Sequence, residues 1–213
     1  QMVFPWLFQV DKFGWCADAS VWPIQPIRNT DDNIFQTYQK IAFSGISKFE
    51  QPIRQNLNIR NGYLLFLCQI PHDQTIKLHS DVSVAQGLLK TIEISKFLKM
   101  QLIVKPHPVN MISMEPLAKI VDDAVKKGND LLWGEGVNIH DLLEKCEAVF
   151  TINSGVGMEA ILHKKPVFCY GKSDYASVSH YIDKEFYWEK RFEHISKYPD
   201  FFDSYVSQMI DVR

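Results

Sequence analysis

The sequence predicts an α/β fold, a doubly wound parallel sheet with helices on both faces. Short, continuous apolar runs recur along the chain, and amphipathic segments of helical periodicity lie between them. Polar clusters of unusual composition directly follow four of these runs. Alternation of strand and helix is typical of parallel sheets, and ligands bind outside the carboxyl ends of such strands. The polar clusters therefore mark the candidate functional site.

Five strands are expected in the central part of the chain. The first, YLLFLCQI, is almost entirely apolar and is bounded by Asn61-Gly62 and Pro71, which is typical of a strand buried on both faces. The others are similar or shorter runs with turn residues at their ends. The expected strands are residues 63–70, 101–105, 130–134, 147–153 and 166–171.

The segments between these strands predict helices. Residues 82–99 carry Val84, Leu88, Ile92 and Leu98 close to helical spacing, with lysine and glutamate between them. The expected helices are residues 82–99, 114–128, 138–146 and 154–165. The third of these helices begins at an asparagine, a favoured N-cap residue.

The flanks of the chain have a different character. Residues 1–60 are rich in aromatic and turn residues, with a helix expected from Asp32 to about Phe43, and we interpret them as a segment that remains from a preceding domain. Residues 61–178 are the predicted Rossmann-like domain. Residues 179–213 are aromatic with a helical pattern that breaks at Pro199, and we expect helices that pack back on the sheet.

Composition excludes several classes of protein. Of the 213 residues, 46% are hydrophobic and 23% charged, as in a globular protein with a sizeable core. The formal net charge of -2 offers no overall field that would attract nucleic acid. The four cysteines lack metal-binding spacing, and no apolar run approaches the ~18 residues needed to span a bilayer. We expect a cytoplasmic protein with reduced thiols that binds neither nucleic acid nor a metal ion.

The cluster after the fourth strand, NSGVGMEA, predicts an anion site. Asn153 and Ser154 lie where the strand turns into a helix, and Gly155 and Gly157 allow a ligand to approach the backbone closely. The N–H groups and the positive dipole end of a helix N-terminus suit a phosphate. Glu159, one turn later, is placed to accept a hydrogen bond from a sugar hydroxyl such as that of ribose. The alternative interpretation is a tightly packed, capped helix start with a surface glutamate.

The cluster after the second strand, KPHP, supplies donors for the same phosphate. Lys105 and His107 lie on a loop that Pro106 and Pro108 stiffen, because each proline restricts its own φ angle. A loop held in place before the ligand arrives loses less entropy on binding. Alternatively, the histidine caps the strand or acts as a general base.

The clusters after the first and fifth strands complete the expected crevice. Gln69, His72 and Asp73 follow the first strand, and Tyr175 follows the fifth. An aspartate at this edge is a candidate base or nucleophile, the roles that carboxylates take in the chemistry of glycosidic bonds. Asp11, in FQVDKFGW, is a second candidate. The alternative for both aspartates is a side chain that only stabilises a turn.

The remaining histidines show no metal-like spacing. They are His79, His140, His163, His180 and His194. We interpret each of them as a structural or surface residue, and we expect no metal site in this chain.

These motifs resemble a capsular polysaccharide biosynthesis family of GT-B glycosyltransferases, whose characterised members transfer Kdo (3-deoxy-D-manno-octulosonic acid) from CMP-Kdo. The matching segments are LCQIPHDQTI, LIVKPHP and FTINSGVGMEAILHKKPVFCYGKSDY, in that order, with FPWLFQVDKFGW before the domain. An HP motif paired with Ser-Gly-x-Gly-x-Glu-Ala also occurs in other transferases, including bacterial sialyltransferases.

The resemblance implies a role for individual residues. His107, with Lys105 nearby, would bind the CMP phosphate, and Ser154 with the amides after it would bind that phosphate from the other side. Glu159 would hold the ribose, and the main chain near Pro106 would contact cytosine. In this family an aspartate follows a Q-x-x-x-D strand as the candidate catalytic nucleophile of a retaining reaction, and Asp73 matches it.

The implied activity is that of a metal-independent, retaining glycosyltransferase without a cofactor. Its donor would be a nucleotide sugar, CMP-Kdo first, and its acceptor a glycan or glycolipid of a surface polysaccharide. The alternatives are another donor, such as CMP-sialic acid, a UDP-sugar or CDP-glycerol, and a catalytically silent nucleotide- or glycan-binding module.

The family's acceptor domain does not fit within residues 1–60. We expect either a shortened chain or a second chain that supplies that domain, and peripheral association with membrane-bound capsule assembly machinery at the inner membrane.

Overall fold

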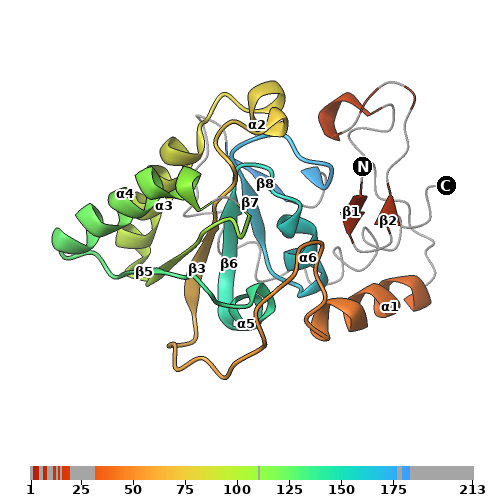
Figure 1. The fold of residues 1–213 in the computed structure, drawn as a ribbon, viewed down its shortest axis with the longest axis horizontal. Helices are drawn as coiled ribbons and strands as arrows, with labels where there is room; N and C mark the ends of the chain where they lie inside the picture. Colours follow the sequence, from red (N-terminus) through yellow and green to blue (C-terminus); the bar gives the residue numbers. More distant parts are fainter. Residues whose placement is uncertain are drawn as a thin grey trace.

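The computed structural model describes residues 2–4, 7–8, 12, 14, 16–19, 32–109, 111–176 and 179–182. Its centre is a six-stranded parallel sheet in the order β5-β4-β3-β6-β7-β8 (Figure 1). The strands are β3 (Tyr63–Leu67), β4 (Leu102–Lys105), β5 (Leu131–Trp133), β6 (Cys146–Thr151), β7 (Val167–Cys169) and β8 (His180–Tyr181). The predicted doubly wound sheet is confirmed.

The path of the chain creates a crevice in the middle of this sheet. The chain enters at β3, moves outward through β4 and β5, and returns to the other side of β3 for β6, β7 and β8. Connections on the two sides of β3 therefore run in opposite directions, and β3 and β6 flank the topological switch point. In open parallel sheets such a point leaves a ligand-binding crevice at the carboxyl ends of the strands.

Helices cover both faces of the sheet, as the sequence pattern predicts. Figure 1 shows α3 (Val84–Leu98) and α4 (Glu115–Lys126) on one side, and α1 (Asp32–Phe43), α5 (Ile139–Lys145) and α6 (Val156–Leu162) on the other. Ser83 and Gln86 form a capping box at the start of α3, and the side chain of Asn138 caps α5 as predicted. Pro116 occupies the first turn of α4, where its missing N–H has no cost.

The smaller elements lie outside this alternation. The helix α2 (Gln74–His79), which the sequence analysis missed, follows β3 directly. The strands β1 (Met2–Phe4) and β2 (Leu7–Phe8) form a separate antiparallel pair. The short 3-10 helices are η1 (Cys16–Asp18) and η2 (Ile112–Met114).

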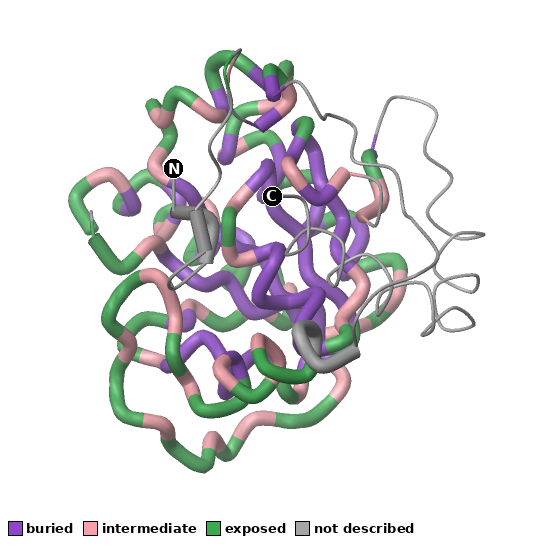
Figure 2. Tube along the Cα trace, turned by 90° about the vertical axis from the view of Figure 1, so that its right-hand side faces the viewer, coloured by how far each residue is buried: buried purple, intermediate pink, exposed green. Residues whose placement is uncertain are grey.

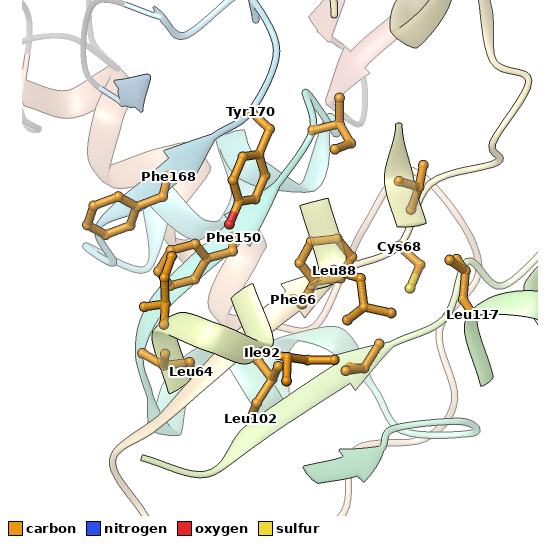
Figure 3. Packing of buried hydrophobic residues seen from close by; sticks show 14 of the residues in the cluster. Leu64, Phe66, Cys68, Leu88, Ile92, Leu102, Leu117, Phe150, Phe168 and Tyr170 are labelled. Atoms are coloured by element: carbon orange, nitrogen blue, oxygen red, sulfur yellow. The ribbon is translucent and has the colours of Figure 1, made fainter. Parts of the chain in front are cut away.

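The sheet divides the hydrophobic core in two. One half packs α3 and α4 on the sheet, and the other packs α1, α5 and α6. Alternate residues of β3 enter each half, Leu64 and Phe66 one and Leu65 the other, because side chains of a strand alternate between faces. In Figure 3 the side chains of Phe66, Phe150 and Leu88 meet between the sheet and α3. Figure 2 shows the buried segments in the interior and the exposed ones around the outside.

The predicted helical character of residues 179–213 is wrong at its start. His180 and Tyr181 form β8, which pairs in parallel with β7. The amide of Ile182 donates to the carbonyl of Cys169 at 2.8 Å, and the Ile182 side chain is buried. Pairing with an open sheet edge, together with this burial, outweighs a helical pattern. The remaining predicted helices, after residue 182, lie outside the described residues, as does Asp11.

Across the described ranges, no helix is both long and apolar enough to cross a membrane. The proposed division at residues 60 and 178 stays a prediction, but the segment before β3 packs closely on the sheet domain, as described below.

Candidate functional site

A cavity lies at the carboxyl ends of β3, β4 and β6, on the two sides of the switch point. Of the predicted site residues, ten line it: Gln69, Asp73, Lys105, Pro106, His107, Asn153, Ser154, Gly155, Glu159 and Tyr175. The structure therefore brings together polar residues from four separate segments of the sequence, because parallel strands end at the same edge of the sheet.

Gln69 and Asn153 join the ends of β3 and β6 across the switch point. Gln69 Nε2 donates to Asn153 Oδ1 at 2.9 Å, and the backbone N–H of Asn153 donates to Gln69 Oε1 at 2.8 Å. Asn153 Nδ2 also donates to the carbonyls of Thr75 and Lys172. Both side chains are buried and hydrogen-bonded within the protein. They hold the cavity in shape and leave the ligand contacts to their neighbours.

Ser154 and Gly155 form the turn into α6 at the cavity wall. Ser154 Oγ accepts the Val156 amide hydrogen at 3.3 Å, which leaves the hydroxyl hydrogen available to a ligand. Tyr175 Oη donates to the Ser154 carbonyl and so fixes this turn.

Gly157 has a different role from the predicted one. It does not line the cavity, and a Cβ at this position would lie 2.1 Å from Tyr175 Oη. The prediction that Gly157 lets a ligand approach the backbone is wrong. The glycine makes room for the Tyr175 ring, which packs against the start of α6.

Lys105 brings a buried amine to the cavity wall. Its residue is 8% exposed at the end of β4, and among the described side chains no carboxylate forms an ion pair with it. Burial lowers the pKa of Lys105, while Cys68 and Glu135 act in the opposite direction. A buried ammonium without a close partner is costly, so an anion in the cavity would stabilise its charged form.

His107 is half-buried beside Lys105, and its ring orientation is determined by two contacts. Its Nδ1 accepts the amide hydrogen of Val109 at 3.3 Å, and its ring packs edge-on against Phe49 at a centroid distance of 5.4 Å. With Nδ1 as acceptor, the neutral ring carries its hydrogen on Nε2. Burial lowers the pKa of His107, Asp73 raises it, and Lys105 lowers it. At neutral pH this histidine is therefore a neutral hydrogen-bond donor.

Asp73 lines the cavity and is also the N-cap of α2. Its Oδ1 accepts from the Thr75 amide at 2.9 Å and from the Thr75 hydroxyl at 2.8 Å. Asp73 therefore stabilises the local backbone, as the alternative interpretation expected, and it also lines the cavity. His72 is exposed and is not part of the wall, so it does not face the crevice as predicted.

Glu159 is buried and is not a surface residue. Only 2% of it is exposed, and its Oε1 accepts a hydrogen bond from Ser47 Oγ at 2.8 Å. Burial raises the pKa of Glu159 to about 8, although Ser47 and Lys48 act in the opposite direction. The carboxyl group is therefore mostly neutral at pH 7 in the free protein.

The sequence analysis missed a whole wall of the cavity, residues 47–51. Ser47, Lys48, Phe49 and Gln51 line it, and Gln51 Oε1 accepts the amide hydrogen of Ile139 at the start of α5. This segment has no secondary structure and no periodic pattern, so its sequence carries no signal for a site.

Within the described residues, no group of three or more His, Cys, Asp or Glu side chains is arranged to hold a metal ion.

Comparison with known proteins identifies the family. The model of the family described as "Capsule polysaccharide biosynthesis protein" matches residues 31–212, most of the chain. The chain belongs to this capsule polysaccharide biosynthesis family. The family resemblance inferred from the HP and Ser-Gly-x-Gly-x-Glu-Ala motifs is thereby confirmed.

Relatives of this capsule family protein include the capsule polysaccharide export protein KpsS of Escherichia coli, 28% identical over 119 residues. These cover 53% of this chain and 31% of KpsS, so the matched segment spans about a third of that relative.

Among solved structures, the Thermosulfurimonas dismutans KpsC β-Kdo 2,4 transferase is 16% identical with a TM-score of 0.47, over 81% of this chain and 54% of that one. A Methanocaldococcus jannaschii UDP-GlcNAc 2-epimerase in complex with UDP-GlcNAc and UDP is 18% identical with a TM-score of 0.45, over 78% of this chain and 46% of that one.

Proposed function

We propose that this chain is the donor-binding part of a glycosyltransferase that builds capsular polysaccharide, and that its cavity binds the nucleotide of a nucleotide sugar. One observation carries the proposal: Lys105, His107 and Ser154 line a single cavity at the switch point of a parallel sheet. An ammonium, a neutral imidazole N–H and a hydroxyl together suit a phosphate. Membership of a capsule biosynthesis family supports a polysaccharide as the product.

Glu159 and Phe49 suit the parts of a nucleotide other than its phosphate. Glu159 lines the cavity, and its carboxylate would accept a hydrogen bond from a ribose hydroxyl. Phe49, packed against His107, offers an aromatic surface beside the phosphate donors. CMP is the first candidate nucleotide and Kdo the first candidate sugar, on the resemblance of the sequence motifs to CMP-Kdo-dependent transferases.

Asp73 is the proposed catalytic nucleophile. Its carboxylate oxygen would form a bond to the anomeric carbon while the bond from that carbon to the CMP phosphate breaks, and CMP would leave with the electron pair. An acceptor hydroxyl would then displace the carboxylate and release its proton to water, and two inversions retain the anomeric configuration. Lys105 would neutralise the charge that develops on the leaving phosphate, and His107 would donate a hydrogen bond to it, without a metal ion.

A second candidate is a nucleotide-binding module that transfers nothing. The specific observation in its favour is the hydrogen bonding of Asp73, which has a complete structural role as the cap of α2. Other donors, such as CMP-sialic acid, a UDP-sugar or CDP-glycerol, remain alternatives for the same cavity.

Calorimetric titration of the protein with CMP, UMP, CDP and UDP tests the proposal. We expect CMP to bind more tightly than UMP, and inorganic phosphate to compete with it. Binding of none of the nucleotides would reject the function, and a clear preference for UDP over CMP would reject the CMP-linked donor.

A further inference from the structure

Three buried ionisable side chains form a line that begins at the cavity. They are Glu159 on α6, His140 on α5 and His163 just after α6, with 2%, 0% and 6% of each residue exposed. Glu159 Oε2 lies 3.4 Å from His140 Nε2, and His140 Nδ1 lies 2.9 Å from His163 Nε2. Only Glu159 lines the cavity. The two histidines stand behind it.

Glu159 and His140 lie close together, but one polar atom of each lacks a complete hydrogen bond. Glu159 Oε2 and His140 Nε2 are both buried, and neither completes a hydrogen bond of good geometry. Buried polar atoms in native proteins nearly always have a partner. Hydrogen bonds of binding and catalytic sites are often long in the free protein and shorten when the ligand arrives.

Both histidines are neutral at physiological pH. Burial lowers the pKa of His140 to about 4 and that of His163 to about 3. Charged groups from the surrounding segments shift the pKa values of these three residues. They are Lys48 from the 47–51 wall, Arg54 from the segment before β3, Asp141 and Glu144 from α5, and Lys165 after α6. Arg54 forms ion pairs with both Asp141 and Glu144, so its charge is largely balanced.

A neutral imidazole carries its hydrogen on one of its two ring nitrogens. The hydrogen bond that the other nitrogen makes determines which of the two it is. When His163 donates its Nε2 hydrogen to His140 Nδ1, the hydrogen of His140 is on Nε2, 3.4 Å from Glu159 Oε2, and the backbone of Ile46 is a second partner for this ring. A carboxylate has about four acceptor positions. Ser47 and the Lys48 amide use two of them, and the N–H of His140 would use a third, which leaves one for a ligand in the cavity.

We propose that His140 is a positioning residue for Glu159: His163 selects the His140 tautomer whose Nε2 hydrogen binds Glu159 Oε2, and this holds the ionised carboxylate ready for a ribose hydroxyl. The inference rests on the proposed function, because it requires a nucleotide in the cavity. The neutral His140 stabilises the carboxylate through its N–H, and His163 acts only through His140.

The test compares CMP with 2′,3′-dideoxy-CMP, which lacks the ribose hydroxyls, by calorimetry at about pH 9, above the Glu159 pKa of about 8, so that the carboxyl group is ionised. In the unmodified protein CMP should bind about tenfold more tightly, the ratio expected for one hydrogen bond to a charged group. His140→Leu should reduce the ratio to about one, because the carboxyl group loses its N–H donor. His140→Gln should restore most of the ratio, since its amide N–H can reach the same oxygen. A purely structural role for His140 would weaken both nucleotides alike and leave the ratio unchanged.

His163→Phe is the second variant, and it keeps an aromatic ring in the edge-on contact with Phe43. It should also lower the ratio, because His140 Nδ1 loses its donor. His180→Gln is the matched control, a histidine packed on Phe168 in the other half of the core, and it should leave the ratio unchanged.

The outcomes separate the two proposals. An unchanged ratio in folded His140→Leu or, if that variant does not fold, in His163→Phe overturns the positioning role while CMP binding still supports the proposed function. If the unmodified protein binds neither nucleotide, both proposals are wrong.

Discussion

The hydroxyl of Ser47 donates to the carboxyl oxygen of Glu159 at 2.8 Å, which joins residues 112 positions apart in the chain. The segment before β3 is attached to the sheet domain at further points. Gln51 caps the first turn of α5, and Asn138 donates to the carbonyl of Pro52. The segment before the sheet therefore forms part of the site.

Ser47→Ala should destabilise the protein by about 1–2 kcal/mol, because it leaves a buried carboxyl oxygen without its donor. Urea denaturation measures the loss. Ser44→Ala is the matched control, since the exposed Ser44 hydroxyl donates only to a carbonyl of its own helix end, and it should cost less. Equal losses in the two variants would show that the Ser47–Glu159 hydrogen bond contributes no more to stability than the exposed hydrogen bond of Ser44.

His107→Ala should weaken CMP binding by about 1.5–3 kcal/mol, the range for a hydrogen bond to a charged group. Calorimetry measures the change, and thermal unfolding checks that the protein is intact. His72→Ala, an exposed histidine outside the cavity wall, should bind CMP as the unmodified protein does. Unchanged affinity in His107→Ala would remove this residue from the phosphate site.

Asp73→Asn separates the two roles of this residue. Asparagine is as good an N-cap as aspartate, so the free energy of unfolding should change by less than about 0.5 kcal/mol. A neutral amide cannot attack the anomeric carbon, so CMP release from CMP-Kdo by the full-length protein should be lost. The same rate of CMP release in both proteins would leave Asp73 with its capping role alone.

Gly157→Ala should destabilise the protein by about 1–3 kcal/mol, because the added methyl group overlaps the Tyr175 hydroxyl and the site has no space for it. Tyr175→Ala in the same chain should remove the overlap. A double-mutant cycle of unfolding free energies therefore should show a favourable coupling between the two substitutions. Simple additivity would mean that the ring does not occupy this space.

The buried histidines predict an acid-sensitive fold. The pKa values of His140 and His163 are lowered to about 4 and about 3, against about 6.5 in an unfolded chain. Between about pH 4 and 6.5 the unfolded chain therefore binds more protons, and the unfolding free energy decreases as the pH falls. Between about pH 4.5 and 8 the folded chain binds more protons at Glu159, so this group alone raises the unfolding free energy as the pH falls.

His163→Phe removes one of these titrating groups. The loss of unfolding free energy between pH 6.5 and 4.5 should shrink by about 1–2 kcal/mol, as urea denaturation at several pH values can measure. His72→Ala serves as the exposed control. Parallel pH profiles for His163→Phe and the unmodified protein would contradict the burial argument.

Local sequence patterns predicted most of the sheet and its helices. Continuous apolar runs such as YLLFLCQI are stable only when they are buried on both faces of a sheet, and Asn138 marks a helix start through a hydrogen bond within a few residues. The error at His180 and Tyr181 arose because an edge strand of two residues depends on its neighbour β7 and not on its own pattern. The sequence analysis misses α2 because it interprets Asp73 as a catalytic candidate or a turn residue and not as the N-cap of a helix.

The candidate site was predictable to the extent that it lies at strand ends. Lys105, His107 and Ser154 follow apolar runs, and a parallel sheet must bring such positions to one edge. The 47–51 wall, the burial of Glu159 and the use of Gly157 by Tyr175 depend on contacts between distant segments, which no local pattern records.

The sequence by itself determined the alternation of strand and helix, and with it the edge where phosphate-binding side chains gather, because periodicity and capping are properties of neighbouring residues. Only the tertiary structure decided which polar groups remain open to a ligand. Gln69 and Asn153 satisfy one another, Asp73 caps a helix, and His140 stands behind Glu159. The physical reason is that hydrogen bonding and burial are decided by partners that the chain brings together only when it folds.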